Sequence, residues 1–216
     1  MGHFAAFDIF RLAEPADAGE VVAALAAVVD ARARTTPGFL LSRVHLTLDG
    51  STLVHHTRWT SERNYRLWCP DHAAVGEPGP PYRHAAVRTA VTVTGIAAGG
   101  IQGPAVGQPP RVAAVAIRHF AGPEPAAAVL GLLHRSGQWK RDHPGFIAAD
   151  VCLSADGRTF VNYPAWTGRS AYEAWMADPR ISAGQAEVAR LELAPPQYFV
   201  CTVEHEVVGH HISPQR

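Results

Sequence analysis

The chain has 216 residues, 47% of them hydrophobic and 18% charged, which is a globular composition with room for one large domain or two small ones. Its 19 basic residues balance 19 acidic ones without a basic block, which argues against nucleic acid or an anionic membrane as a partner. The longest apolar run, residues 21–29, is too short to cross a bilayer, and no basic segment marks a signal peptide. Three cysteines without CxxC spacing predict neither a disulfide framework nor a zinc ribbon, so we expect a cytoplasmic protein.

The chain contains an internal repeat. At an offset of 107 residues, residues 37–68 align without a gap with residues 144–175, and 13 of the 32 positions are identical. Composition alone would give roughly two matches. The identical positions include a Pro-Gly-Phe triplet, an Asp-Gly pair, two tryptophans and a tyrosine. Two copies of one module are therefore present.

Each copy predicts the same elements, beginning with a strand and a helix. An apolar stretch at residues 4–12, and again at 112–120, is typical of a strand. A helix follows, which Asp17 is expected to cap in the first copy and which begins near Pro123 in the second. The Pro-Gly-Phe triplet ends that helix.

A hairpin, a second helix and a closing strand complete each copy. The Asp-Gly pair is the hairpin turn, and the strand after it ends at Trp59 or Trp166. Ser61 is expected to cap the second helix, and the closing strands fall at residues 86–94 and 198–207. The order β-α-β-β-α-β predicts an α+β fold of two tandem ferredoxin-like modules that dock as an intrachain α+β barrel pseudo-dimer.

Glycine and proline separate the two copies. Residues 95–110 hold five glycines and three prolines and no charge, a composition typical of a linker. Residues 76–81 have no counterpart in the second copy and are expected to form an inserted loop. The expected boundaries are 1–95 for the first module, 96–110 for the linker, 111–208 for the second module and 209–216 for a tail.

One face of the third strand carries a polar group four residues before the tryptophan, and a tyrosine follows six residues after it. Alternate side chains of a strand share a face. The residues concerned are His55, Trp59 and Tyr65 in the first copy and Asn162, Trp166 and Tyr172 in the second. Such a face suits a flat aromatic ligand, because the indole forms a wall and the polar group polarises a ligand oxygen. The alternative is that these are ordinary core aromatics.

Whether His45 lies on this face depends on the register of the hairpin. If Asp49 and Gly50 form a two-residue turn, His55 pairs with Val44 and His45 faces away. If the loop has three residues, His45 lies opposite His55 and beside the tryptophan. Both registers are open at this point, and so are a catalytic and a structural role for His45.

The histidines near the C-terminus do not predict a metal centre. His205 and His210 are five residues apart, which would place them roughly 140° apart on a helix, whereas the zinc protease helix needs a spacing of four. The segment also alternates like a strand. Glycine-rich nucleotide motifs and a nucleophile elbow are missing as well. We expect no metal and no tightly bound cofactor.

The pattern Pro-Gly-Phe, strand, Asp-Gly, strand ending in Asn-Tyr-x-x-Trp, and a later tyrosine resembles antibiotic biosynthesis monooxygenase domains of the dimeric α+β barrel superfamily. The second copy fits best, and the first has His55 and His56 where the second has Asn162 and Tyr163. The resemblance implies an oxygenase that acts on an aromatic polyketide with molecular oxygen, by hydroxylation, quinone formation or oxidative ring cleavage. The fused length is similar to that of angucycline ring-opening oxygenases.

The resemblance also implies site residues. Asn162, Trp166 and Tyr172 match pocket positions of anthrone-oxidising members, as oxyanion donor, wall and proton relay. The pocket histidine of those members corresponds to His45, and either His45 or His55 is a candidate base with an ordinary pKa near 6.5. The candidates for substrate binding are Trp59, Tyr65, Phe146 and Trp175.

On this hypothesis, molecular oxygen is the co-substrate and a small aromatic polyketide is the partner. A substrate that must first be reduced would draw on reduced flavin from a flavin reductase. Two alternatives use the same fold: a non-oxidative polyketide cyclase or isomerase, and a heme-binding or non-catalytic protein. The duplication fits a monomer or a homodimer, and the sequence does not choose between the two modules as the active one.

Overall fold

The computed structural model describes residues 2–69 and 84–209. By its internal contacts the chain divides into two compact units. The first unit comprises residues 1–94 with 203–216, and the second comprises residues 95–202. The loop expected at residues 76–81 and most of the expected tail lie outside the described residues.

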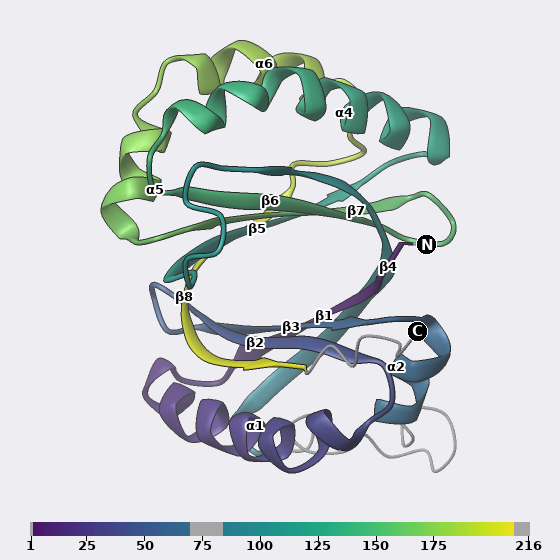
Figure 1. The fold of residues 1–216 in the computed structure, drawn as a ribbon, viewed down its shortest axis with the longest axis vertical. Helices are drawn as coiled ribbons and strands as arrows, with labels where there is room; N and C mark the ends of the chain where they lie inside the picture. The colour runs from purple at the N-terminus through teal and green to yellow at the C-terminus, as the bar shows by residue number, and fades with distance from the viewer. Residues whose placement is uncertain (1, 70–83, 210–216) are drawn as a thin grey trace, which may run out of the picture. The chain divides into compact units, whose positions relative to one another are not determined.

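The first unit is a sheet with helices on one face (Figure 1). Its central strand β3 is antiparallel to both of its neighbours, β1 and β2. Apolar side chains of α1 pack with Trp59 and Tyr65 in one core cluster. The elements are β1 (Phe4–Leu12), η1 (Pro15–Asp17), α1 (Ala18–Arg32), η2 (Ala33–Thr35), β2 (Phe39–Thr47), β3 (Thr52–Trp59) and α2 (Glu62–Trp68).

The second unit repeats the order strand, helix, two strands and helix, and its described part includes a further helix, α6. Its strand β7 is antiparallel to β5 and β6, and β8 pairs with the other edge of β5. Three α-helices cover one face of the sheet (Figure 1). The elements are β5 (Val112–His119), α4 (Pro123–Ser136), η3 (Gln138–Asp142), β6 (Phe146–Leu153), β7 (Thr159–Trp166), α5 (Arg169–Met176), α6 (Arg180–Ala189) and β8 (Gln197–Val208).

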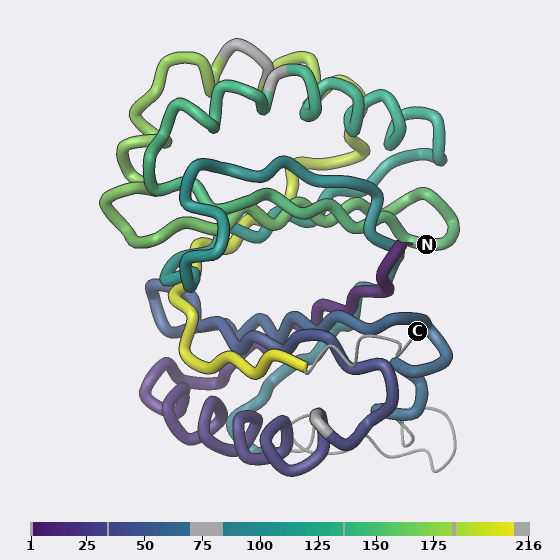
Figure 2. The backbone as a smooth tube through the Cα atoms, viewed as in Figure 1, coloured from purple at the N-terminus to yellow at the C-terminus, as the bar shows by residue number. Residues whose placement is uncertain are grey.

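Two long strands belong to both units. β4 (Val87–Gln102) begins in the first unit and pairs with β6 in the second, and β8 begins in the second unit and ends in the first (Figure 2). The hydrogen-bonded order of the strands is β1-β3-β2 in the first unit and β8-β5-β7-β6-β4 in the second. The predicted α+β fold of two ferredoxin-like modules is thereby confirmed.

The segment expected to be a linker is a strand for half of its length, because β4 continues to Gln102. Two of the glycines near this segment lie where β4 approaches β6 closely. A Cβ added at Gly95 would lie 2.2 Å from the carbonyl oxygen of Leu153, and one at Gly100 would lie 2.8 Å from that of Ala149. Glycine is therefore required here by the neighbouring backbone of β6, which composition alone does not reveal.

Most predicted elements lie where the sequence places them. β1 spans residues 4–12, and β3 and β7 end at Trp59 and Trp166 as expected. Ser61 caps α2 by accepting a hydrogen bond from the backbone N–H of Asn64 at 3.2 Å. Asp17 occupies the N-cap position of α1 as expected, but its side chain makes no capping hydrogen bond, because the chain enters α1 through the 3-10 turn η1.

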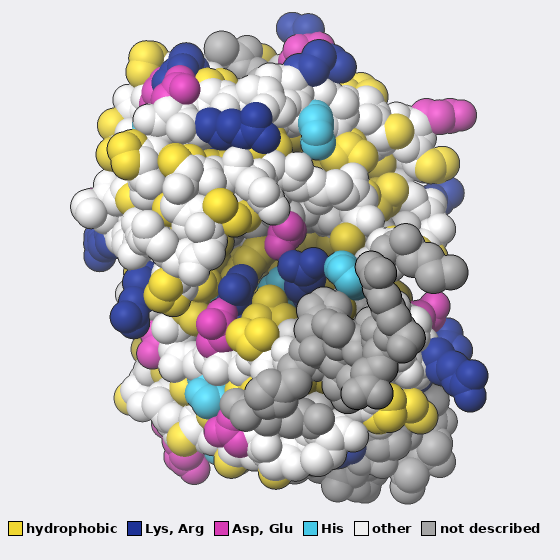
Figure 3. Space-filling view, viewed as in Figure 1, with side chains coloured by type: hydrophobic (Ala, Val, Ile, Leu, Met, Phe, Trp, Pro, Cys, Tyr) yellow, Lys and Arg dark blue, Asp and Glu magenta, His cyan; other side chains and the backbone are white. Residues whose placement is uncertain are grey.

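The distribution of charge on the surface agrees with the equal numbers of basic and acidic residues in the sequence. In the space-filling view, side chains of both charge signs are interspersed on the visible face (Figure 3). None of the described helices is long and apolar enough to cross a membrane. All three cysteines are free.

Candidate active site

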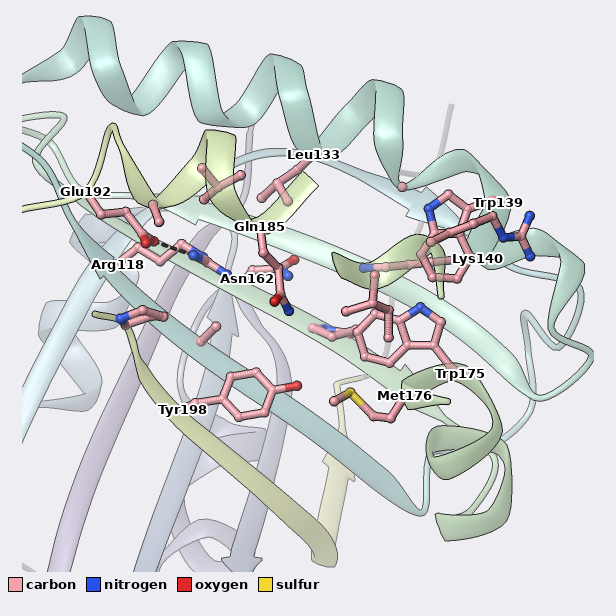
Figure 4. A pocket seen from close by; sticks show the side chains of 18 residues that line it. Arg118, Leu133, Trp139, Lys140, Asn162, Trp175, Met176, Gln185, Glu192 and Tyr198 are labelled. Carbon is pink, nitrogen blue, oxygen red and sulfur yellow. Dashed lines mark hydrogen bonds and ion pairs between the residues drawn. The ribbon is translucent and has the colours of Figure 1, made fainter. Parts of the chain in front are cut away.

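The second unit contains a cavity of about 510 Å³ between the sheet and the helices (Figure 4). The sheet contributes side chains from β5, β7 and β8, and the other walls come from α4, η3, α5 and α6. The size and the largely apolar lining suit a small aromatic ligand. The polar, charged and aromatic residues that line it include Arg118, Trp139, Lys140, Asn162, Trp175, Arg180, Glu192 and Tyr198.

Asn162 presents an unused amide to this cavity. It lies on β7, where it pairs with Ala116 of β5 and Val151 of β6. No side chain or backbone group that the structure describes makes a hydrogen bond to its amide. The amide is thus available to donate to a ligand oxygen, the role that the sequence suggested for it.

Two tryptophans form one side of the cavity as a stack. Trp175 of α5 lines the cavity, and Trp166 lies behind it, with ring centroids 5.2 Å apart and an interplanar angle of 30°. Trp166 is 0% exposed and is not among the lining residues. Neither indole N–H has a hydrogen-bond partner within the described part of the chain. Trp175 therefore forms the aromatic wall of the cavity that was expected of Trp166.

Tyr172 reaches the cavity through a second tyrosine. It is buried on α5, and its hydroxyl lies 3.3 Å from the hydroxyl of Tyr198 on β8, which lines the cavity. Burial and this hydrogen bond raise the pKa of Tyr198 above its ordinary value. The Tyr198 phenol is therefore protonated at neutral pH, and its hydrogen bond with Tyr172 connects the cavity to the core. The sequence pattern did not single out Tyr198.

Charged side chains complete the cavity, and sequence reasoning missed them. Arg118 forms an ion pair with Glu192 (Figure 4). Arg180 packs over the Trp139 ring, 4.6 Å from its centroid. Lys140 is only 8% exposed and lies over Phe146, another candidate for substrate binding, which is fully buried beneath it.

His55, the counterpart of Asn162 in the first unit, is held in a buried polar network. Its Nε2 lies 2.9 Å from Ser42 Oγ, and its Nδ1 lies 3.4 Å from Asp8 Oδ2. Asp8 pairs with His55 across β1 and β3 as Ala116 pairs with Asn162 in the second unit. All three side chains are buried.

The remaining aromatic candidates of the first unit are core residues. Trp59 is fully buried, and the rings of Phe39, Tyr65 and Trp68 pack around it. Burial raises the pKa of Tyr65 above its ordinary value. The structure thus brings Trp59 and Tyr65 together, as Trp166 and Tyr172 are in the second unit.

The hairpin register turns His45 away from Trp59. Val44 pairs with His55, and His45 pairs with Val54, which is the first of the two registers open in the sequence. His45 is 0% exposed, and its Nδ1 lies 2.9 Å from the Val54 carbonyl oxygen, to which it donates. Burial lowers the pKa of His45 to about 3, so the ring is neutral and a poor base near neutral pH.

The donor groups do not gather into a metal centre in residues 2–69 and 84–209. No group of three or more histidine, cysteine, aspartate or glutamate side chains there could hold a metal ion. Instead, Nε2 of His205 lies 3.1 Å from Oδ1 of Asp30, within ion-pair distance.

Part of the second unit is similar in sequence to known proteins. Residues 114–187 match the family described as antibiotic biosynthesis monooxygenase. The tetracenomycin-F1 monooxygenase of Streptomyces glaucescens is 35% identical over 65 residues, which are 30% of this chain and 56% of that protein. The chain therefore spans little more than half the length of this relative.

Solved structures share the fold over nearly the whole chain. An anthrone oxidase-like protein has a TM-score of 0.73 at 16% identity, covering 96% of this chain and 94% of its own. A mutant chlorite dismutase from Candidatus Nitrospira defluvii has a TM-score of 0.59 at 12% identity, covering 94% and 92%. At these identities the likeness shows the fold alone. The sequence match, in contrast, spans Asn162, Trp175 and Lys140, because residues 114–187 of this chain match the antibiotic biosynthesis monooxygenase family.

Proposed function

We propose that the cavity of the second unit is the active site of an oxygenase that acts on an aromatic polyketide with molecular oxygen. The observation that carries the proposal is the unused amide of Asn162 beside an aromatic wall, in the part of the chain that matches the family. Trp175 would stack on the flat rings, and the Asn162 amide would donate to a ring oxygen.

An electron-rich phenolic ring system can reduce oxygen by itself. Loss of a proton from an anthrone methylene leaves a delocalised anion, which passes electrons to O2 and combines with it as a hydroperoxide. The hydroperoxide then loses water to give the quinone, so anthrone and O2 become anthraquinone and H2O. The protein must stabilise the developing oxyanion and exclude bulk water, and we assign the first task to Asn162.

We assign the protonation of the peroxide to the phenol pair of Tyr172 and Tyr198, whereas the methylene proton passes to a water molecule. Tyr198 faces the cavity, and Tyr172 connects it to the buried interior. A phenol with a raised pKa is a hydrogen-bond donor at neutral pH, so Tyr198 is suited to protonate the peroxide oxygen that leaves as water. His55 remains a candidate base for the first unit, where Asp8 would orient it.

Oxygen uptake tests the proposal. Metal-stripped protein is mixed with a hydroxylated anthrone, with and without reduced flavin and its reductase, and the product is identified by mass. Uptake above the uncatalysed rate, with one O2 consumed per quinone formed, is expected without flavin for an anthrone. A ligand-induced change in tryptophan fluorescence without oxygen uptake would indicate a cyclase or binding protein instead. A Soret band on titration with hemin would indicate the heme alternative.

A further inference from the structure

The cavity of the second unit contains a buried cation without a counter-ion. Lys140 is the single lysine of the sequence, and it lies on η3 with 8% of its surface exposed. Its Nζ lies 5.1 Å from the ring centroid of Trp175 and 6.0 Å from that of Phe146. Among the described residues, no carboxylate lies within ion-pair distance of this Nζ. Figure 4 shows the side chain passing between Trp139 and Trp175 toward the middle of the cavity.

The other cations of the cavity are already compensated. Arg118 is paired with Glu192. Arg180 is paired with two carboxylates, Asp142 at 2.6 Å and Asp178 at 2.7 Å. Among the cations that line the cavity, Lys140 is thus the one for which the described residues supply no carboxylate within ion-pair distance. Arg118 and the phenol of Tyr198 line the same cavity from the sheet, and the charge of Arg118 helps to lower the pKa of Lys140.

We propose that Lys140 binds an anionic oxygen of the aromatic ligand, either a ring carboxylate or an ionised phenol. The inference rests on the proposed function only in taking the ligand to be a flat aromatic. A buried ammonium is unfavourable until an anion compensates it, so a negatively charged ligand recovers free energy that a neutral ligand cannot. The two aromatic rings hold the ammonium through cation–π contacts and leave its N–H donors facing the cavity.

The position of Lys140 orients the ligand within the cavity. Asn162 on the sheet and Lys140 on η3 both line the cavity, so a ligand oxygen can bind each of them while the rings stack on Trp175. Burial lowers the pKa of Lys140 to about 8, which leaves most of it charged at neutral pH. Lys140 is thus a specificity-determining residue, because it selects rings that carry an acidic group over neutral rings.

A matched pair of ligands isolates this charge. A dihydroxyanthraquinone carboxylic acid and its carboxamide have the same rings and nearly the same shape and differ in one charge. Binding is followed anaerobically by tryptophan fluorescence, and the ionisation of the phenols is followed by visible absorption between pH 6 and pH 8. The proteins are wild type, Lys140→Met, Lys140→Arg and Arg190→Met, the last removing an exposed positive charge from the same unit.

The inference predicts one of two results. If the carboxylate is the anion, wild type and Arg190→Met bind the acid at least about tenfold more tightly than the amide, Lys140→Met loses this preference, and Lys140→Arg retains it. If a phenolate is the anion, wild type binds both ligands with ionised phenols at neutral pH, and Lys140→Met binds them with neutral phenols.

Other outcomes would overturn the inference. It fails if wild type neither distinguishes the acid from the amide nor ionises the phenols, if it binds neither ligand, or if Lys140→Met keeps the wild-type behaviour. The proposed function fails separately, on oxygen uptake. Oxygen uptake that does not depend on Lys140 would support the proposed oxygenase and contradict a role of Lys140 in turnover. Preference for the charged ligand without oxygen uptake would instead indicate a binding protein or cyclase that recognises acidic rings.

Discussion

Trp166 and Trp175 stack with their ring centroids 5.2 Å apart, yet one ring is fully buried and the other lines the cavity. The two residues are nine positions apart, on a strand and on the helix that follows it. The inner tryptophan sets the position of the outer one, so the shape of the site depends on a residue that does not line the cavity.

Replacing Trp166 should mainly lower stability, whereas replacing Trp175 should mainly weaken ligand binding. Trp166→Phe leaves a void in a fully packed region and should lower the free energy of unfolding by roughly 2 kcal/mol. Trp175→Phe should change stability less and weaken ligand binding roughly three- to tenfold, because stacking area is lost at the cavity. Urea denaturation and fluorescence titration measure the two quantities. Equal effects of both variants on binding and stability would contradict the division of roles.

The tyrosine pair should affect turnover more than affinity. Tyr172→Phe removes the hydroxyl that lies 3.3 Å from Tyr198 while keeping the ring, so kcat should fall roughly a hundredfold with KM nearly unchanged. Tyr198→Phe should have a similar effect. Tyr65→Phe, the equivalent change in the first unit, serves as the control and should leave kcat near the wild-type value. A Tyr172→Phe enzyme with wild-type kcat would remove the pair from the mechanism.

His45 should make the protein sensitive to acid. Its pKa is lowered to about 3 by burial, whereas the unfolded chain binds the same proton near pH 6.5. The unfolded state therefore gains protons first as the pH falls below 6.5, and His45 alone should lower the free energy of unfolding by about 2 kcal/mol between pH 7 and pH 5. His45→Asn keeps a donor for the Val54 carbonyl and cannot titrate in this range. Denaturant curves at both pH values should show a smaller acid loss in this variant; an equal loss would place the sensitivity elsewhere.

Lys140 predicts that stability also rises with pH on the alkaline side. Its pKa is lowered to about 8 in the folded protein and is near 10.4 in the unfolded chain. Between these values the unfolded state carries more protons, so the contribution of Lys140 to stability is unfavourable below pH 8 and is relieved as the pH rises. Lys140→Met should be the more stable protein at pH 7, by about 3 kcal/mol, and its advantage should shrink to about 1 kcal/mol by pH 9.5. Thermal or urea unfolding at both pH values checks this, and a constant difference would show that the ammonium is solvated.

The sequence could predict the fold because the repeat and the turn residues are local signals. The Asp-Gly pair determines the hairpin register, and the same register occurs in both units, with Val44 opposite His55 and Val151 opposite Asn162. The length of β4 could not be predicted, since glycines needed for close strand approach have the composition of a linker.

The walls of the cavity depend on contacts that are distant in the sequence. Lys140 precedes Arg141 and Asp142 in a charged run that is typical of a surface, and its burial follows from packing against Phe146 and Trp175 on other elements. The helix α6 was missed because it lies beyond residues 144–175, where the repeat aligns, and because Ile181 and Val188 are its only large apolar residues. Several of its residues, such as Gln185, face the cavity and not a core.

The most direct test of the account compares Asn162→Ala with His55→Ala, the same position of the repeat in the two units. Oxygen uptake with a hydroxylated anthrone is measured for both variants and for wild type, at protein concentrations matched by the folded fraction. If the cavity of the second unit is the active site, Asn162→Ala should lose roughly a hundredfold or more in kcat, and His55→Ala should retain most of the wild-type rate per folded molecule. Full activity of Asn162→Ala, or loss confined to His55→Ala, would contradict the assignment of the site.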